Sequence, residues 1–282
     1  MLYIGTDLGT SAVKLLLMDE AGQIKNIVSK EYPLFFPHPG WSEQNPEDWY
    51  AKFVEGVREL LEGCDRTQVE GISFGGQMHG LVALDEQDRV IRPAILWNDG
   101  RSAMETEYLN DTIGRENISK YTANIAFAGF TAPKILWMKK HEPENYQKCR
   151  HILLPKDYIR QVLTGVFATE VSDASGMQLL DVQGRCWSEE VLRALDIDRS
   201  LLGEVYESCE ITGTLLPEIA ERTGLNADTI VVGGAGDNAA AAVGTGVVAD
   251  GAAFTTIGTS GVVYAHSSKL AVDPKGRVHT CC

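Results

Sequence analysis

The sequence is short of basic side chains and has no long apolar run, and each shortage excludes a class of protein. It carries 25 lysine and arginine residues against 39 aspartate and glutamate residues, a net charge of −14. Such a chain lacks the positive field that attracts nucleic acid or an anionic membrane. No apolar run approaches the roughly 18 residues that a membrane-spanning helix needs. We therefore expect neither nucleic acid nor a membrane as a partner.

Cysteine pairs with the spacing of a metal or redox site are also missing. The 6 cysteines show no C-x-x-C pattern, so ordinary reduced thiols are predicted. The sequence starts directly on the apolar residues 2–5, with no charged-then-apolar leader. We expect a cytoplasmic protein. Its 282 residues with 44% hydrophobic content are enough for one large or two ordinary domains.

Apolar runs and turn residues predict how the chain opens. The spacing of apolar residues predicts strands at 2–8, 12–18, 24–33 and 69–74, with a helix at 45–61 between the last two. Asn45 is the expected cap of that helix, and Gly63 is expected to end it. Three strands, a helix and another strand are typical of a ribonuclease-H-like (actin-like ATPase) α/β domain. The middle, 97–225, alternates helix-like and loop-like segments, which we interpret as inserted helices.

The last part of the chain repeats a feature of its start. A short helix opens at 216–218, a strand is predicted at 229–232 and a helix of small residues at 239–243. The turn Gly9-Thr10-Ser11 then recurs as Gly258-Thr259-Ser260, again between two apolar β-runs, 252–257 and 262–265. If the second turn opens another actin-like domain, residues 263–282 are too few to build it. We therefore predict a domain at 1–245, the first hairpin of a second domain at 246–282, and a chain that is a fragment or a truncated gene product.

The repeated turn is the first candidate site. Gly9 permits close backbone approach to a phosphate, and Thr10 and Ser11 supply donors. Asp7, directly before the turn, could hold Mg²⁺, because hard cations prefer oxygen ligands. The alternative is a plain hairpin turn. The second copy, with Gly258 and Thr259, favours a nucleotide phosphate gripped from two sides.

Two further segments could carry chemistry. Asp237 follows a predicted strand and begins a helix, so it is either a helix cap or a general base for a sugar hydroxyl. At a helix N-terminus its carboxyl should ionise easily. The loop Gln77-Met78-His79 follows the strand at 69–74 and offers groups suited to sugar hydroxyls, although it could be only a polar loop.

The segment around Trp97 is a weaker candidate. Trp97 offers an aromatic face to a sugar or belongs to the core, and the core is the favoured interpretation. Asp99 and Arg101, which follow it, are favoured as a structural ion pair.

Together these segments resemble the FGGY family of carbohydrate kinases, and within it the kinases that act on D-xylulose. The residues at 129–137 resemble the family signature, with Thr131, Lys134 and Trp137 at signature positions. The other similar segments occur in family order at 7–11, 77–80, 97–101, 154–158, 172–176, 234–239 and 258–260. Family members are roughly twice as long as this chain and carry a second actin-like domain with a Gly-rich adenosine-binding motif.

The resemblance implies a kinase that uses ATP and Mg²⁺ to phosphorylate a ketopentose, with a homodimer left open. It makes Asp237 the catalytic base, Asp7 the support of Mg²⁺ and the γ-phosphate, and Met78 with His79 the contacts to the sugar. We also predict sugar contacts for Gln77 and Trp97. The alternatives are a kinase for another polyol, such as glycerol, gluconate or ribulose, and a non-catalytic sugar-binding remnant. We expect this chain alone to be inactive.

Overall fold

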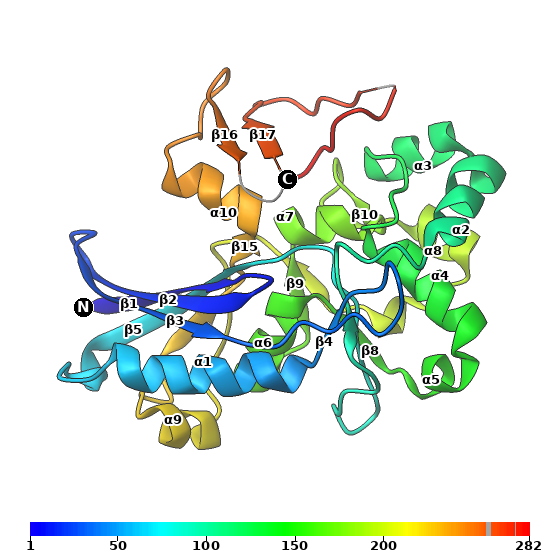
Figure 1. Cartoon of the computed structure of the whole chain (residues 1–282). Coiled ribbons are helices and arrows are strands. Elements are labelled where there is room, and N and C mark those ends of the chain that lie inside the picture. Colours follow the sequence, from blue (N-terminus) through cyan, green and yellow to red (C-terminus); the bar gives the residue numbers. More distant parts are fainter. Residues whose placement is uncertain (258–260, 274) are drawn as a thin grey trace.

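A mixed β-sheet forms the centre of the structure (Figure 1). The computed structural model describes residues 1–257, 261–273 and 275–282. The strands follow the order β13, β14, β5, β1, β2, β3, and β15 also pairs with β5. Their bounds are β1 Leu2–Leu8, β2 Ala12–Asp19, β3 Ile24–Glu31, β5 Val69–Gly76, β13 Ile211–Thr214, β14 Ile230–Val232 and β15 Ala235–Gly236.

The directions of these strands define the fold. β1, β2 and β3 form an antiparallel meander, whereas β5 runs parallel to β1, and β14 and β15 run parallel to β5. β13 is antiparallel to β14 at the other edge of the sheet. This is the ribonuclease-H-like, actin-like arrangement that the sequence predicts.

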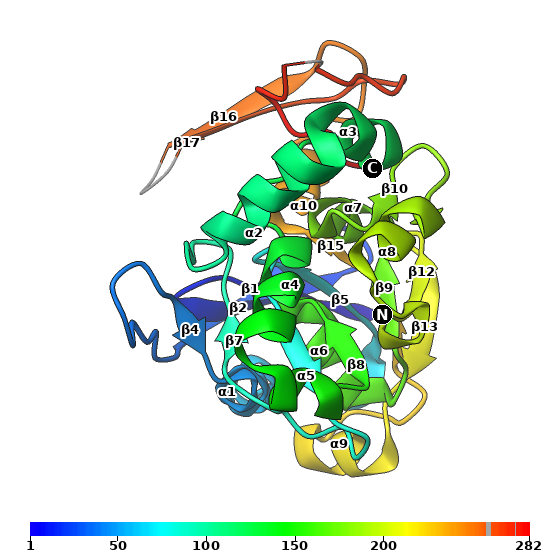
Figure 2. The same cartoon turned by 90° about the vertical axis from the view of Figure 1, so that its right-hand side faces the viewer.

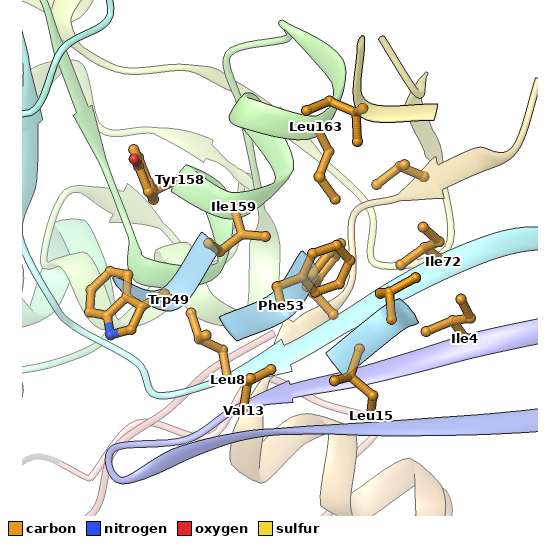
Figure 3. Close-up of a cluster of buried hydrophobic side chains, with 14 of the residues drawn as sticks. Ile4, Leu8, Val13, Leu15, Trp49, Phe53, Ile72, Tyr158, Ile159 and Leu163 are labelled. Carbon is orange, nitrogen blue, oxygen red and sulfur yellow. The ribbon is translucent and has the colours of Figure 1, made fainter. Parts of the chain in front are cut away.

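Helix α1 (Pro46–Leu60) covers one face of the sheet through an apolar stripe. Trp49, Phe53 and Val57 recur every fourth residue and are fully buried. Figure 3 shows Trp49 and Phe53 packed above Leu8 and Leu15 of the sheet, with side chains of α6 (Pro155–Thr164) closing the cluster. Each such side chain contributes about 1.5–3 kcal/mol when it leaves water. The core of the domain therefore lies between the sheet, α1 and α6.

The start of α1 differs in one detail from the prediction. Asn45 occupies the N-cap position, but its side chain makes no cap hydrogen bond. Its amide donates instead to the carboxylate of Asp48, at 3.3 Å. The prediction of side-chain capping by Asn45 is therefore wrong. The helix ends at Leu60, and Gly63, three residues later, has a left-handed φ of 73°.

Apart from α6, β13 and the helix at 217–223, the segment at 97–225 forms a second cluster of mostly short elements beside the sheet (Figures 1 and 2). Its helices pack around a separate apolar core that includes Leu109, Trp137 and Leu180. The helices here are α2 Ala103–Glu107, the π-helix η2 Tyr108–Gly114, α3 Arg115–Thr122, α4 Thr131–His141, α5 Pro143–Lys148, α7 Val171–Ala174, η3 Ser175–Met177, α8 Glu189–Leu195 and η4 Arg199–Leu201. The remaining short elements before residue 225 are β4 Glu43–Gln44, η1 Arg66–Gln68, β6 Val82–Leu84, β7 Ala94–Ile95, β8 His151–Leu153, β9 Ala168–Glu170, β10 Leu180–Asp181, β11 Cys186–Trp187, β12 Glu204–Tyr206 and α9 Pro217–Thr223.

The chain continues through α10 (Asp237–Gly244) into a hairpin of β16 (Ala253–Ile257) and β17 (Gly261–Ala265). Within the described residues this hairpin pairs only with itself and not with the central sheet. The domain boundary at 245/246 stays a prediction. The predicted phosphate contacts Gly258 and Thr259 lie outside the described residues. None of the helices within the ranges above is long and apolar enough to cross a membrane.

Candidate active site

The sheet register brings Asp7, the loop at 77–80 and Asp237 to the carboxyl ends of neighbouring strands. Asp7 of β1 lies opposite Gly75 of β5, and Gly75 lies opposite Ala235 of β15. These three strands are parallel, so their carboxyl ends meet, and ligands of open α/β sheets bind outside such ends. Asp7 stands there directly, the loop at 77–80 leaves β5, and Asp237 follows β15.

Asp237 is the first residue of α10 and is exposed to solvent. The N-cap of the helix is Gly236, so the alternative of Asp237 as the cap is wrong. Its Oδ1 accepts hydrogen bonds from the backbone amide and the side chain of Asn238, at 2.7 and 2.9 Å. This pair of donors fixes the carboxylate at the end of β15, and no hydrogen bond from the described residues reaches Oδ2.

The carboxyls of Asp237 and Asp7 are shifted in the same direction. Although Asp237 is exposed, the surrounding protein reduces the hydration of its carboxyl and raises its pKa, and the negative charge of Asp7 raises it further, against the two hydrogen bonds from Asn238. Partial burial also raises the pKa of Asp7, and Lys14 offsets part of that rise. The expectation of an easily ionised Asp237 is therefore wrong in direction, because loss of hydration outweighs the helix terminus. A raised pKa makes a carboxylate a stronger base.

The turn before Asp237 requires glycine. Gly234 has a φ of 78°, and a Cβ there would overlap the carbonyl oxygen of Phe74. At Gly236 a Cβ would come within 2.7 Å of the Met78 sulfur. The glycines thus let β15 approach β5 and let Met78 pack against the residue before Asp237.

A buried charged cluster beneath the same turn holds its backbone. Gly236 donates its amide hydrogen to Ser172 Oγ at 3.0 Å, and Ser172 donates to Glu170 at 2.9 Å. Glu170 is paired with the fully buried ammonium of Lys156 at 3.3 Å. Arg160 donates to the carbonyl oxygen of Gly233 at 2.6 Å. We did not predict this cluster as part of the site; the only signal was that 154–158 and 172–176 occur in family order.

The predicted phosphate turn is held from three sides. The Gly9 amide donates to the carbonyl oxygen of Ala12 at 3.1 Å, which closes the hairpin. The carbonyl oxygen of Thr10 accepts from Gln44 at 2.7 Å, and its hydroxyl accepts from the Trp97 indole nitrogen at 3.0 Å. Ser11 is exposed at the tip. Trp97 is itself 39% exposed, so the favoured interpretation of Trp97 as core is wrong, and it links its loop to the turn.

Asp99 and Arg101 form the structural ion pair that the sequence favours. The guanidinium donates to both carboxylate oxygens of Asp99, at 2.9 and 2.7 Å, and lies 3.7 Å from the ring centroid of Trp41. Asp99 also accepts from the Ser42 amide at 2.6 Å. Both side chains are buried, and the polar groups they contact belong to the protein.

Gln77 is the first residue of the loop at 77–80, which follows β5. Its side chain is buried and donates to Gln44 at 3.0 Å. Gln44 is the same residue that holds Thr10. Gln77 therefore couples the loop to the predicted phosphate turn through its buried side chain.

His79 is fixed in an unusual backbone conformation. Its φ is 68°, in the left-handed region, and its Nδ1 lies 3.0 Å from the Gly176 carbonyl oxygen. A carbonyl only accepts, so Nδ1 carries the hydrogen and Nε2 keeps a lone pair. Burial lowers the pKa of His79 to about 3. The ring is a neutral imidazole whose Nε2 can accept a hydrogen bond from a hydroxyl group.

The family-signature segment holds the His79 backbone. Thr131 and Lys134 of α4 both donate to the His79 carbonyl oxygen, at 3.1 Å. The Lys134 ammonium also contacts the carbonyl oxygens of Gly129 and Phe130 and is fully buried. Burial lowers its pKa to about 7. The sequence placed these residues in the signature but gave no sign that they position the His79 loop.

The chain is similar to known proteins in sequence and in fold. The family model described as "FGGY family of carbohydrate kinases, N-terminal domain" matches residues 2–244. The xylulose kinase of Escherichia coli is 44% identical over 281 residues, which cover 100% of this chain and 57% of that protein. A crystal structure described as a "xyloylose kinase" from Brucella ovis has a TM-score of 0.94 at 41% identity and covers 100% of this chain and 58% of its own.

A third similar protein is described as a kinase for a different substrate. The crystal structure of a gluconate kinase from Lactobacillus acidophilus has a TM-score of 0.93 at 25% identity, and the alignment covers 98% of this chain and 56% of that one. The chain thus spans little more than half the length of the relatives it matches. The family model covers most of the chain, and the chain therefore belongs to the FGGY family of carbohydrate kinases.

Proposed function

We propose that the chain is the substrate-binding part of a pentulose kinase that transfers phosphate from ATP to D-xylulose and yields D-xylulose 5-phosphate. One observation carries this proposal: Asp7, the Met78-His79 loop and Asp237 meet at the carboxyl ends of three parallel strands. The names of the xylulose kinase from Escherichia coli and the Brucella ovis protein support D-xylulose as the acceptor.

The proposed step moves one proton and one phosphoryl group. Nε2 of His79 accepts a hydrogen bond from one sugar hydroxyl, while Met78 contacts the carbon skeleton. The terminal hydroxyl oxygen attacks the γ-phosphorus, the bond to the ADP oxygen breaks, and Asp237 accepts the hydroxyl proton as the new bond forms. The raised pKa of Asp237 suits a carboxylate that must take up this proton.

The proposed phosphate side of the site offers few side chains that could bind a metal ion. Among the described residues, no group of three or more His, Cys, Asp or Glu side chains could hold a metal ion alone. A Mg²⁺ ion bound with ATP needs only one or two protein carboxylates, and Asp7 at the turn fits that need. When bound, Mg²⁺ neutralises charge on the phosphates. We assign Gly9, Thr10 and Ser11 to the phosphates from this side, and Gly258 and Thr259 from the other.

The remaining parts of the proposal concern context. We propose domains at 1–245 and 246–282, with the second phosphate turn in the latter. Because ATP is the donor, we propose that the protein acts in the cytoplasm, and a homodimer stays a prediction. The gluconate kinase neighbour favours one second candidate, a kinase of the same mechanism for another polyol.

The test is the substitution Asp237→Asn in this chain joined to the C-terminal part of the Escherichia coli xylulose kinase. Asn keeps the size of Asp but cannot accept the proton, so kcat should fall about 10²–10⁴-fold while KM for D-xylulose changes little. The helix cap is Gly236, so the melting temperature should stay close to that of the parent. Near-normal turnover by the Asn variant would remove Asp237 from the mechanism.

A further inference from the structure

The segment at 275–282 returns to the loop that carries His79. Asn124 exchanges two hydrogen bonds with the backbone of Thr280, both at 2.8 Å. The Cys282 amide donates to Ser175 Oγ at 3.1 Å, and the next residue, Gly176, accepts from His79. In Figure 1 the end marked C lies beside α7, directly before this Ser175-Gly176 turn. The segment and His79 are therefore anchored to neighbouring residues.

These anchors place His279 against Phe130, the phenylalanine that His79 also contacts, and against Phe127. Its ring centroid lies 4.4 Å from that of Phe127 and 4.9 Å from that of Phe130. The Phe130 ring is in turn 4.7 Å from the His79 ring. His279 is exposed to solvent. The two imidazoles thus flank one phenylalanine.

We propose that His279 is a second sugar-binding imidazole, which hydrogen-bonds a hydroxyl of the ketose that His79 contacts. This inference rests on the proposed function. The partly exposed ring of Phe127 offers an apolar surface for the C–H face of a sugar, and the imidazoles on either side of the buried Phe130 offer hydrogen bonds to its hydroxyls. The two-sided clamp from Asn124 fixes the backbone next to His279, so little ordering is needed on binding.

The alternative is that His279 only packs on the phenylalanines. His279→Phe separates the two roles, because Phe keeps an aromatic ring in contact with Phe127 and Phe130 but has no hydrogen-bonding atom. His279→Ala removes both. His141→Ala is the matched control, because His141 also stacks on an aromatic ring, Trp137 at 5.2 Å, and is 45% exposed.

Calorimetric titration of residues 1–282 with D-xylulose tests the proposal. His279→Ala and His279→Phe should each raise Kd about tenfold, the value of one hydrogen bond, with unchanged melting temperatures. His141→Ala should bind like the parent chain. Parent-like affinity of His279→Phe would overturn the proposal in favour of packing.

A further variant separates this inference from the proposed function. His79→Ala should weaken binding at least as strongly as the changes at His279. If His79→Ala weakens binding and neither variant of His279 does, only this inference is overturned. Absence of D-xylulose binding by the parent chain would overturn the proposed function and the inference together.

Discussion

Asp237 shows how far a residue's local position predicts its chemistry. Its place after a strand and at a helix start was readable from the sequence, and so was the choice between a cap and a base. The direction of its pKa was not, because that depends on Asp7 and on the burial supplied by a different part of the chain. The spacing of 230 residues between the two carboxylates is bridged only by the parallel pairing of β1, β5 and β15.

His79 makes the folded chain sensitive to acid. Its pKa is about 3 in the folded protein and about 6.5 in an unfolded chain. Between these values the unfolded state binds a proton that the folded state does not, so stability is fully present above pH 6.5 and declines as the pH falls. His79→Gln removes this contribution. Melting curves from pH 7.5 to 4.5 should therefore show a smaller loss of melting temperature for the variant than for the parent, and identical losses would contradict the assignment of a neutral, buried His79.

At the scale of elements, the sequence predicts the sheet better than the segment that follows it. Residues 2–8, 12–18 and 69–74 agree with β1, β2 and β5 within two residues, because alternation and turn residues act locally. The helices between 97 and 225 are short and are fixed by packing around their own core, so periodicity gave only their existence.

The burial of charged residues in the middle of the chain was harder to predict from the sequence than the helices. Lys156 and Lys134 are fully buried, and a charged residue in a single sequence is usually placed on the surface. Lys156 is paired with Asp157, Glu170 and Asp173, which lie up to 17 positions away in the sequence and meet it only in the folded chain. The burial of Trp97 and Gln77 was also hard to predict. Trp97 is exposed and Gln77 is buried, and their hydrogen-bond partners, Thr10 and Gln44, lie in distant segments.

The turn that leads into β15 and α10 has no room for an added methyl group at Gly234. In Gly234→Ala the new Cβ would overlap the Phe74 carbonyl oxygen, and alanine would have to adopt a left-handed φ of 78°. Either β5 or the turn must therefore move. We expect a loss of about 1–3 kcal/mol in the free energy of unfolding, measured by urea denaturation. Because Gly234 lies close to Asp237 in the chain, we also expect the Gly234→Ala variant to bind D-xylulose more weakly.

Gly244→Ala is the matched control for that variant. Gly244 lies in α10 with nothing within 4 Å of its missing Cβ, and its φ is not in the left-handed region. Alanine favours a helix over glycine by up to about 1 kcal/mol, so this variant should be neutral or more stable. Equal destabilisation by both substitutions would show that the Gly234 turn is not the cause.

At the scale of the whole molecule, the proposed sugar-binding groups all lie in this chain of 282 residues, which covers 57% of the Escherichia coli xylulose kinase. The strand ends supply Asp7 and Asp237, α4 and η3 hold the His79 loop, and α6 and α7 hold the turn before Asp237. The central claim is that a ketose binds at this edge of the sheet.

A crystal structure of the chain with bound D-xylulose tests that claim most directly. We predict a sugar hydroxyl within about 2.6–3.2 Å of the Asp237 carboxylate and another hydroxyl at Nε2 of His79. One competing location is a cavity of about 500 Å³ lined by residues 36–42 and Asn98. D-xylulose found in that cavity, with the strand edge left to solvent, would contradict the account.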